Sequence, residues 1–442
     1  MKTIDSAVEK YRQLILDAER YIWKHPETGY REFKTSQYMA EKFEEMGYSL
    51  TMAGDIPGFY TVVDTGRPGP EVVVFAELDS LICPNHPECD KETGYVHACG
   101  HNAQCAALLG VAGALTEKEV LDKLCGRVKL CVVPAEELIE IGYRMKLKEQ
   151  GIIKYLGGKA EFLSRGYLDG ADIVFMVHTS ADFGTSLGSV GCIAKKITYK
   201  GLSSHAGGAP WDGINAVYAA TQGLSAANAI RETFKEADII RFHPIITHGG
   251  EAVNAIPEKV VAESFVRGKT FDAMLEANKK LNRALVSGAL AVGGNVEIED
   301  TPGYAPLVNN KDLIELTKEA ADLIIPEEHF EIYERVGSGS TDMGEMTCLF
   351  PSIHPYSGGR TGRSHGDDYC IADPERACVK SAKLQVVMLN LLLKDGAVRA
   401  KKIIKEFKPM FKSKEEYFEY IEQITSAGDR ITYGEDGVTI RV

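Results

Sequence analysis

A cysteine and a histidine two residues apart, Cys99 and His101, are a pair of side chains whose types and spacing suggest chemistry. Cys99 and His101 point the same way in an extended segment, because side-chain direction repeats every two residues. A thiolate and an imidazole placed in this way can bind one metal ion. Gly100 between them permits a tight turn, and the following run is rich in helix formers. A small buried cysteine gives the same pattern, so the pair alone leaves both interpretations open.

Further metal-ligand types stand at the ends of apolar or Gly-rich runs downstream. Glu136 and Glu137 end one apolar strand, His178 ends another, and His365 ends a Gly-rich loop. Open α/β sheets place their sites at the carboxyl ends of strands, so these segments could converge with Cys99 on one metal centre. A lone strand-end histidine is more often structural, and the two glutamates could cap the next helix.

The segment pattern indicates how these residues are positioned. Apolar periodicity and turn signals predict helices over 4–23 and 32–46 and strands over 58–63 and 71–76. Apolar strands over 130–133 and 173–177 then lead to the candidate ligands. The first part of the chain is therefore expected to form an α/β domain.

From about residue 187 the pattern changes to that of a second domain. We expect a strand, a helix, two strands, a helix and a strand over 192–199, 213–234, 239–247, 259–267, 271–290 and 295–299. This β-α-β-β-α-β order is typical of a ferredoxin-like domain. The sequence thus predicts a discontinuous catalytic domain, residues 1–187 plus 302–442, interrupted by an inserted domain, residues 188–301.

Composition excludes several classes of partner. The 442 residues carry a net charge of −13, which argues against nucleic acid or an anionic membrane surface as partner. No apolar run is long enough to span a bilayer, and the N-terminus lacks an apolar signal core. The ten cysteines form no disulfide framework, so a cytoplasmic protein is expected. The segment 83–95, with two cysteines and a histidine, matches no common zinc module and is interpreted as a surface loop.

Six motifs, taken in order, resemble those of the metal-dependent amidohydrolases of the aminoacylase and glutamate-carboxypeptidase superfamily. They are His25-Pro26-Glu27, Ala76-Glu77-Leu78-Asp79, His97-Ala98-Cys99-Gly100-His101, Pro134-Ala135-Glu136-Glu137, Ser204-His205-Ala206 and Asn254-Ala255-Ile256-Pro257. Ser340-Thr341-Asp342-Met343-Gly344 is similar to the aminobenzoyl-glutamate hydrolase and Xaa-Arg dipeptidase-like members. The resemblance covers about residues 10–395. It implies a catalytic α/β/α domain of zinc-exopeptidase type with an inserted ferredoxin-like dimerisation or lid domain.

The resemblance also implies roles for individual residues. The metal ligands would be Cys99, His101, Glu137, His178 and His365. They would hold two divalent ions per subunit, with Zn²⁺ or Mn²⁺ expected and Co²⁺ as a further alternative. Glu136 would be the general base, and His205, from the lid of the other subunit, would steady the oxyanion. Asn254 would accompany His205, and Arg267 would bind the substrate carboxylate, although a surface ion pair explains Arg267 equally well.

The expected activity is hydrolysis of an amide bond in an N-acyl amino acid, an aminobenzoyl-glutamate-like conjugate or a dipeptide, by a homodimer. One residue favours an alternative. Most of the branch has Asp directly after the Cys-Gly-His motif, where this chain has Asn102. Asn cannot carry the charge, so a catalytically weakened or non-catalytic relative that binds a similar amide ligand is the second hypothesis.

Overall fold

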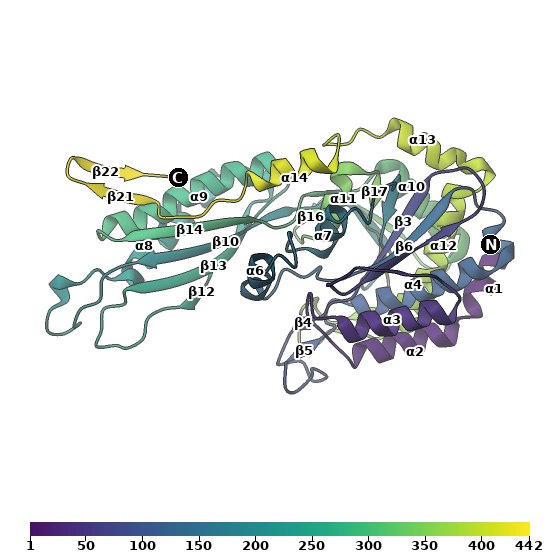
Figure 1. The fold of residues 1–442 in the computed structure, drawn as a ribbon, viewed down its shortest axis with the longest axis horizontal. Coiled ribbons are helices and arrows are strands. Elements are labelled where there is room, and N and C mark those ends of the chain that lie inside the picture. The colour runs from purple at the N-terminus through teal and green to yellow at the C-terminus, as the bar shows by residue number, and fades with distance from the viewer. The chain divides into compact units, whose positions relative to one another are not determined.

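The computed structural model describes residues 1–442 and divides into two compact units (Figure 1). The first unit comprises Met1–Gly188, Leu307–Gly337 and Thr341–Lys414. The second comprises Ser189–Pro306, Ser338–Ser340 and Glu415–Val442. None of the helices combines the length and the apolar character that crossing a bilayer requires.

A six-stranded sheet forms the centre of the first unit. Its order is β1 (Thr51–Met52), β2 (Phe59–Asp64), β6 (Arg127–Val133), β3 (Glu71–Glu77), β7 (Ile173–Phe175) and β17 (Ser352–Ile353). β6, β3, β7 and β17 are parallel to one another, whereas β2 is antiparallel to both β1 and β6. Every residue of β3 is buried, as expected for a central strand covered on both faces.

Helices cover both faces of this sheet, and alternate residues of β3 face different helices. Val72, Val74 and Ala76 belong to the large apolar cluster that includes α4 (His101–Thr116). Phe75 points the other way, with the Lys159 ammonium of α7 (Gly158–Ser164) 5.8 Å from its ring centre. The helix α4 is buried along almost its whole length, which explains why its sequence is apolar on all sides.

The remaining elements of the first unit surround this core. The helices are α1 (Lys2–Glu9), α2 (Arg12–Trp23), α3 (Phe33–Glu45), α5 (Lys118–Leu121), α6 (Ile141–Glu149), α10 (Lys311–Ile324), α11 (Met343–Leu349), α12 (Ser381–Leu393) and α13 (Val398–Glu406). The short strands are β4 (Leu81–Ile82), β5 (Tyr95–Val96), β8 (His178–Thr179), β9 (Gly184–Ser189), β15 (Leu307–Val308), β16 (Glu331–Gly337), β18 (Tyr356–Ser357), β19 (Arg360–Thr361) and β20 (Cys370–Ile371).

The single helix predicted over residues 4–23 is two helices in the structure. Between α1 and α2 the chain leaves the helical conformation at Tyr11. The Tyr11 ring lies against Gly113 of α4, where a Cβ atom would come within 2.5 Å of it. The break therefore lets an aromatic ring fill the space above a glycine, a tertiary contact that helical periodicity does not reveal.

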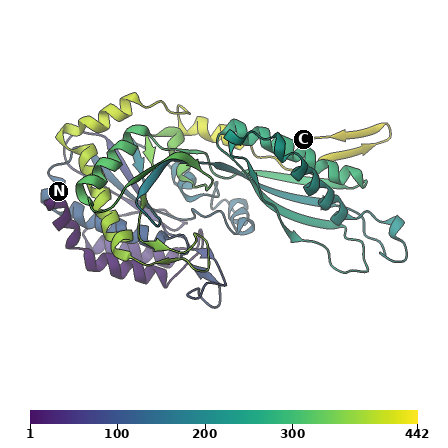
Figure 2. The same cartoon turned by 180° about the vertical axis from the view of Figure 1, so that it is seen from behind.

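The second unit has the predicted β-α-β-β-α-β order, which confirms the ferredoxin-like fold. Its antiparallel sheet runs β11 (Arg241–Phe242), β13 (Lys259–Gly268), β10 (Gly191–Lys200) and β14 (Asn295–Pro302), with β12 (Ile245–His248) also paired to β13. The helices α8 (Ala216–Ala229) and α9 (Phe271–Ala291) cover one face (Figure 2). They approach closely because Gly223 and Gly288 meet, where a Cβ at residue 288 would lie 2.2 Å from the Gly223 nitrogen.

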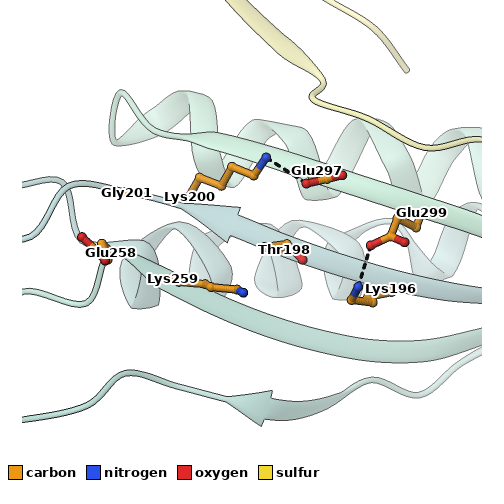
Figure 3. Close-up of a pocket in the computed structure, with 8 residues that line it drawn as sticks. All are labelled: Lys196, Thr198, Lys200, Gly201, Glu258, Lys259, Glu297 and Glu299. Carbon is orange, nitrogen blue, oxygen red and sulfur yellow. Dashed lines mark hydrogen bonds and ion pairs between the residues drawn. The ribbon is translucent and has the colours of Figure 1, made fainter. Parts of the chain in front are cut away.

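The opposite face of this sheet carries charged side chains rather than apolar ones (Figure 3). Lys196 of β10 pairs with Glu299 of β14 at 2.7 Å, and Lys200 pairs with Glu297 at 2.8 Å. Each of the four side chains is between 32% and 49% exposed, so these two ion pairs contribute little to stability.

The predicted domain division is wrong for the C-terminal segment. Residues 302–442 were assigned to the catalytic domain, but Glu415–Val442 belong to the second unit. Ser426 and Asp300 exchange backbone hydrogen bonds of 3.0 and 2.7 Å, and the Arg430 N–H donates to the Val296 carbonyl at 2.9 Å. The segment thus adds to the edge of β14, whose unpaired backbone groups provide partners for any extended chain. In the sequence, α14 (Lys414–Glu422) precedes these paired residues. The hairpin of β21 (Ile431–Gly434) and β22 (Gly437–Ile440) follows them.

Candidate active site

The candidate site lies at the carboxyl ends of three neighbouring parallel strands of the first unit. Asp79 follows β3, Glu136 and Glu137 follow β6, and His178 follows β7. Because β6, β3 and β7 are adjacent and parallel, their ends meet at one edge of the sheet. The tight turn after β6 is made at Ala135, which has a φ of 59°.

The five predicted ligands all gather at this edge. Cys99 and His101 stand at the start of α4, joined by Gly100 with a φ of 89°. Cys99, His101 and His178 offer ligand atoms within 4.8 Å of one another, and so do Cys99, Glu137 and His365. Cys99 belongs to both groups, and its Sγ lies 3.4 Å from Nε2 of His178. The two overlapping groups share the Cys99 thiol, and each offers ligand atoms close enough together for one cation.

The orientation of His101 is the observation that best fits a bound cation. Nδ1 of His101 donates to Asp79, 2.9 Å from its carbonyl oxygen and 3.0 Å from Oδ1. With the proton at Nδ1, Nε2 carries a lone pair. Nε2 is fully buried and lies 3.2 Å from Oε2 of Glu77, another acceptor. Two acceptors at this distance repel each other unless a positive charge sits beside them, so a proton or a metal ion belongs here.

The charges around the cluster perturb the pKa values of its members. Burial and the Glu137 carboxylate raise the pKa of Cys99, but His178 and His101 outweigh them and bring it to about 6. Burial opposes ionisation of Glu137, yet its contact with His365, Nε2 to Oε1 at 3.1 Å, lowers the pKa of Glu137 to about 2. The same contact and Cys99 raise the pKa of His365 to about 11 against the effect of burial. The thiolate form of Cys99 and the carboxylate form of Glu137 are therefore favoured.

Asp79 accepts hydrogen bonds from two of the predicted ligands, His101 and Glu137, although its sequence pattern predicts no role for it. One carboxylate oxygen accepts from His101, and the other accepts the backbone N–H of Glu137 at 2.8 Å. A carboxylate that orients a ligating histidine in this way fixes its tautomer and raises its basicity. Its place directly after the apolar strand β3 is the signal that could have identified it.

A buried lysine lies beneath the cluster. The Lys159 ammonium contacts both Glu77 and Asp342, and none of these three side chains is exposed to solvent. Glu136 completes this acidic group, since Glu77, Glu136 and Asp342 have oxygens within 4.8 Å of one another. Burial, together with Glu77, Glu137 and Asp342, raises the pKa of Glu136 well above its usual value. A carboxyl group in such surroundings binds a proton more readily than an exposed one.

His205 and Asn254 lie together in the second unit. Ala206 donates its backbone N–H to the Asn254 carbonyl at 2.9 Å, and His205 forms a β-bridge with Ala255. Nδ1 of His205 accepts the N–H groups of Gly207 and Gly208 at 3.1 and 2.9 Å. This fixes the proton on Nε2, so the exposed imidazole presents a hydrogen-bond donor.

Arg267 stands near the end of β13 and makes hydrogen bonds within the second unit rather than an ion pair. Its Nη1 donates to the Ser340 hydroxyl at 2.7 Å, and its Nε donates to Nε2 of His243 at 3.2 Å. No carboxylate neutralises the guanidinium, which argues against the surface ion pair considered from the sequence.

Comparison with known proteins decides the family. The model of peptidase family M20/M25/M40 matches residues 72–390, which include all five candidate ligands. The chain belongs to this family. Xaa-Arg dipeptidase of Homo sapiens is 30% identical over 379 residues, covering 83% of this chain and 80% of the dipeptidase. The family prediction made from the motifs is thus confirmed, and this M20/M25/M40 member is a hydrolase of amide or peptide bonds.

Solved structures show the same fold. An aminobenzoyl-glutamate utilization protein of Klebsiella pneumoniae superimposes with a TM-score of 0.67 at 17% identity, covering 89% of this chain and 100% of that one. A dinuclear metal binding peptidase of the M20 family from Bacillus subtilis superimposes with a TM-score of 0.65 at 20% identity, covering 87% and 99%. The predicted combination of a catalytic α/β/α domain and an inserted ferredoxin-like domain is confirmed for this M20/M25/M40 peptidase.

Proposed function

We propose that this hydrolase binds two divalent metal ions and cleaves the amide bond between an acyl or aminoacyl group and an amino acid. The substrate class comprises N-acyl amino acids, aminobenzoyl-glutamate-like conjugates and dipeptides. The observation that carries the proposal is the pair of overlapping ligand groups that share Cys99, with Nε2 of His101 3.2 Å from Oε2 of Glu77. Zn²⁺ and Mn²⁺ suit this mixture of thiolate, imidazole and carboxylate, and Co²⁺ is a further alternative.

Each candidate ligand would contribute its donor atom to one of two adjacent ions. Cys99 would serve both ions, with His101 and His178 on one side and Glu137 and His365 on the other. Ions bound there would supply Lewis acidity, polarising the substrate carbonyl and lowering the pKa of a water molecule. Asp79 would keep His101 and the Glu137 backbone in place while the ligands are engaged.

Glu136 would move the proton. Its carboxylate would accept a proton from the attacking water and deliver it to the leaving amine nitrogen, because an amine is a poor leaving group unless it is protonated. The acidic surroundings that raise its pKa favour acceptance of that proton. Glu137, whose pKa is lowered to about 2, remains ionised and suits the role of ligand. The two neighbouring glutamates would thus divide the tasks of base and ligand.

The inserted domain would provide the substrate-binding groups. Nε2 of His205 carries the proton that an oxyanion would need, and Asn254 lies beside it. Arg267 keeps further N–H groups for the carboxylate of the amino-acid product, since only Nε and Nη1 are engaged. In the proposed homodimer, the exposed His205 would act at the active site of the other subunit.

Metal analysis combined with a substrate screen tests this function. The purified protein should contain two divalent ions per chain and should hydrolyse members of a panel of N-acyl amino acids, aminobenzoyl-glutamate and Xaa-Arg dipeptides. Removal of the α-carboxylate, by offering the corresponding amino-acid amides, should raise KM because Arg267 loses its partner. Turnover of such substrates by fully metal-free protein would contradict the proposal.

A further inference from the structure

The loop 83–95 between β4 and β5 is more than a surface loop, because one of its side chains reaches the interior. His86 is 3% exposed, although most of its neighbours in the loop face solvent. Its Nδ1 accepts the backbone N–H of Glu88 at 3.1 Å, which leaves the proton on Nε2. That Nε2–H donates to the carbonyl oxygen of Tyr369 at 2.8 Å. A hydrogen bond with a defined donor and acceptor therefore joins His86 of the loop to Tyr369, 283 residues further along the chain.

Tyr369 is held on its other side by Trp23 of α2. The two rings are stacked, with centroids 6.5 Å apart and planes inclined by 13°. Trp23 also contacts His86 edge-on at 5.9 Å and donates its indole N–H to Glu88 at 2.9 Å. The loop, α2 and Tyr369 are thus joined by two hydrogen bonds and two ring contacts.

The hydroxyl of Tyr369 points into the turn between two candidate ligands. A Cβ atom at Gly100 would lie 2.3 Å from this oxygen, so the hydroxyl occupies the space that a side chain between Cys99 and His101 would need. The oxygen is buried and has no hydrogen-bond partner. A buried hydroxyl without a partner is unfavourable, so an occupant of the site that offers it a partner would be favoured.

Tyr369 also belongs to the loop that carries a third ligand. His365 lies four residues before it, and the backbone N–H of His365 donates to the Ala98 carbonyl at 2.9 Å. His365 adopts a φ of 61°, a conformation that a non-glycine residue keeps only when its surroundings enforce it. Fixing Tyr369 therefore fixes the end of this loop as well as the turn that contains Gly100.

We propose that His86 and Tyr369 are positioning residues for the metal centre, an inference that rests on the proposed function. His86 holds the Tyr369 carbonyl, Tyr369 sets the spacing between the Cys99–His101 turn and the His365 loop, and its hydroxyl completes the surroundings of the bound ions. Neither residue is a ligand. Residues that orient ligands from outside typically contribute 10–100-fold to metal affinity, so their loss should weaken metal binding.

The test compares three histidine variants by Zn²⁺ titration of metal-free protein against a chromogenic chelator. His86→Leu should weaken the binding of at least one ion about tenfold. His86→Gln, which can present an amide N–H to the Tyr369 carbonyl, should retain affinity within about twofold of the unaltered protein. His329→Leu, at an exposed position of the same unit, is the matched control and should behave as the unaltered protein does.

A second variant keeps the test decisive if His86→Leu does not fold. Tyr369→Phe preserves the stacked ring and removes only the hydroxyl, and it should also weaken Zn²⁺ binding about tenfold. Unchanged affinity in Tyr369→Phe together with equal affinities of His86→Leu and His86→Gln would overturn the inference. Failure of the unaltered protein to bind two Zn²⁺ ions would instead contradict the proposed function, so the two failures are distinguishable.

Discussion

Asn102 donates its side-chain N–H to the carboxylate of Glu19 at 2.8 Å, in the interior beside the candidate metal ligands. Both residues are buried, and Glu19 also contacts Arg20 at 2.9 Å. A buried carboxyl group thus lies next to position 102, where the family resemblance leads us to expect an aspartate. An amide at position 102 therefore has a buried acceptor as its partner, which accounts for the asparagine in structural terms.

This relationship predicts the effect of restoring the aspartate. Asn102→Asp should destabilise the protein by about 1–3 kcal/mol, because a buried donor is replaced by a carboxylate facing another carboxylate. Adding Glu19→Gln should recover most of the loss, since the amide and the acid have then exchanged places. Free energies of unfolding from denaturant titration of all four proteins measure the coupling. Additive effects of the two substitutions would contradict the interpretation.

The division of tasks between the adjacent glutamates gives a second prediction. Glu136→Gln should lower kcat by roughly two to four decades, the usual contribution of a positioned acid–base group, while leaving the metal content unchanged. Glu137→Gln should lower the metal content itself. Metal analysis and steady-state kinetics on both variants provide the measurement. Equal loss of metal in both, with kcat retained in Glu136→Gln, would show that the roles are assigned wrongly.

Metal removal should abolish activity. Chelation followed by dialysis is expected to eliminate turnover, and addition of Zn²⁺ or Mn²⁺ should restore it. Cys99→Ala should lower the amount of bound metal more than Cys105→Ala, because Cys99 lies in both ligand groups. Cys105, within α4, belongs to neither group and donates its S–H to the Glu77 carbonyl of β3. Inductively coupled plasma spectrometry of the purified proteins measures this. Equal metal contents in the two variants would refute the shared-thiolate arrangement.

The metal-free protein should show a pH-dependent stability that arises from Cys99. The pKa of this thiol is lowered to about 6 in the folded protein from an ordinary value near 9. Between these values the unfolded chain binds more protons, so stability rises with pH. The contribution is fully present above pH 9 and is lost as the pH falls through 6. The difference in unfolding free energy between the unaltered protein and Cys99→Ala should therefore shrink from pH 9 to pH 6, and an unchanged difference would contradict the shift.

Subunit exchange tests the proposed role of His205. His205→Ala and Glu136→Gln should each be nearly inactive alone. A mixed dimer would contain one site with an intact Glu136 and an intact His205 from the other chain, so mixing should restore part of the activity. Native mass spectrometry of the mixture provides the control that mixed dimers have formed. If they form without any gain in activity, His205 serves its own subunit.

The local sequence indicates where candidate ligands lie, and the family resemblance is needed to select them as a set. Glu137, His178 and His365 follow apolar or Gly-rich runs, and the parallel arrangement of β6, β3 and β7 brings the ends of the strands together. The inserted domain was predictable for a similar reason, because its order of strands and helices is consecutive in the sequence. Patterns that lie within a short segment and lead to a standard topology carry this information.

The partners of the cluster could not be predicted, because they are joined by pairings across long stretches of chain. Lys159 would be expected at the surface, yet it is buried between Glu77 and Asp342, the second of which lies 183 residues away. The contact of Asn102 with Glu19 spans 83 residues. The C-terminal addition to β14 was missed for the same reason, since a charged segment gives no sign of the edge that it joins.

The C-terminal addition to β14 has a consequence for how copies of this chain can associate. A sheet with two open edges can accept a neighbour on each side, and such stacking continues without limit. Here the backbone of Ser426 and Arg430 covers part of one edge, along β14. On the other side of the sheet, Ile245 and Ile246 of β12 remain 62% and 56% exposed. Another chain that pairs with this sheet would therefore meet β14 already covered along the residues that the terminal segment contacts, whereas β12 stays accessible at the other edge.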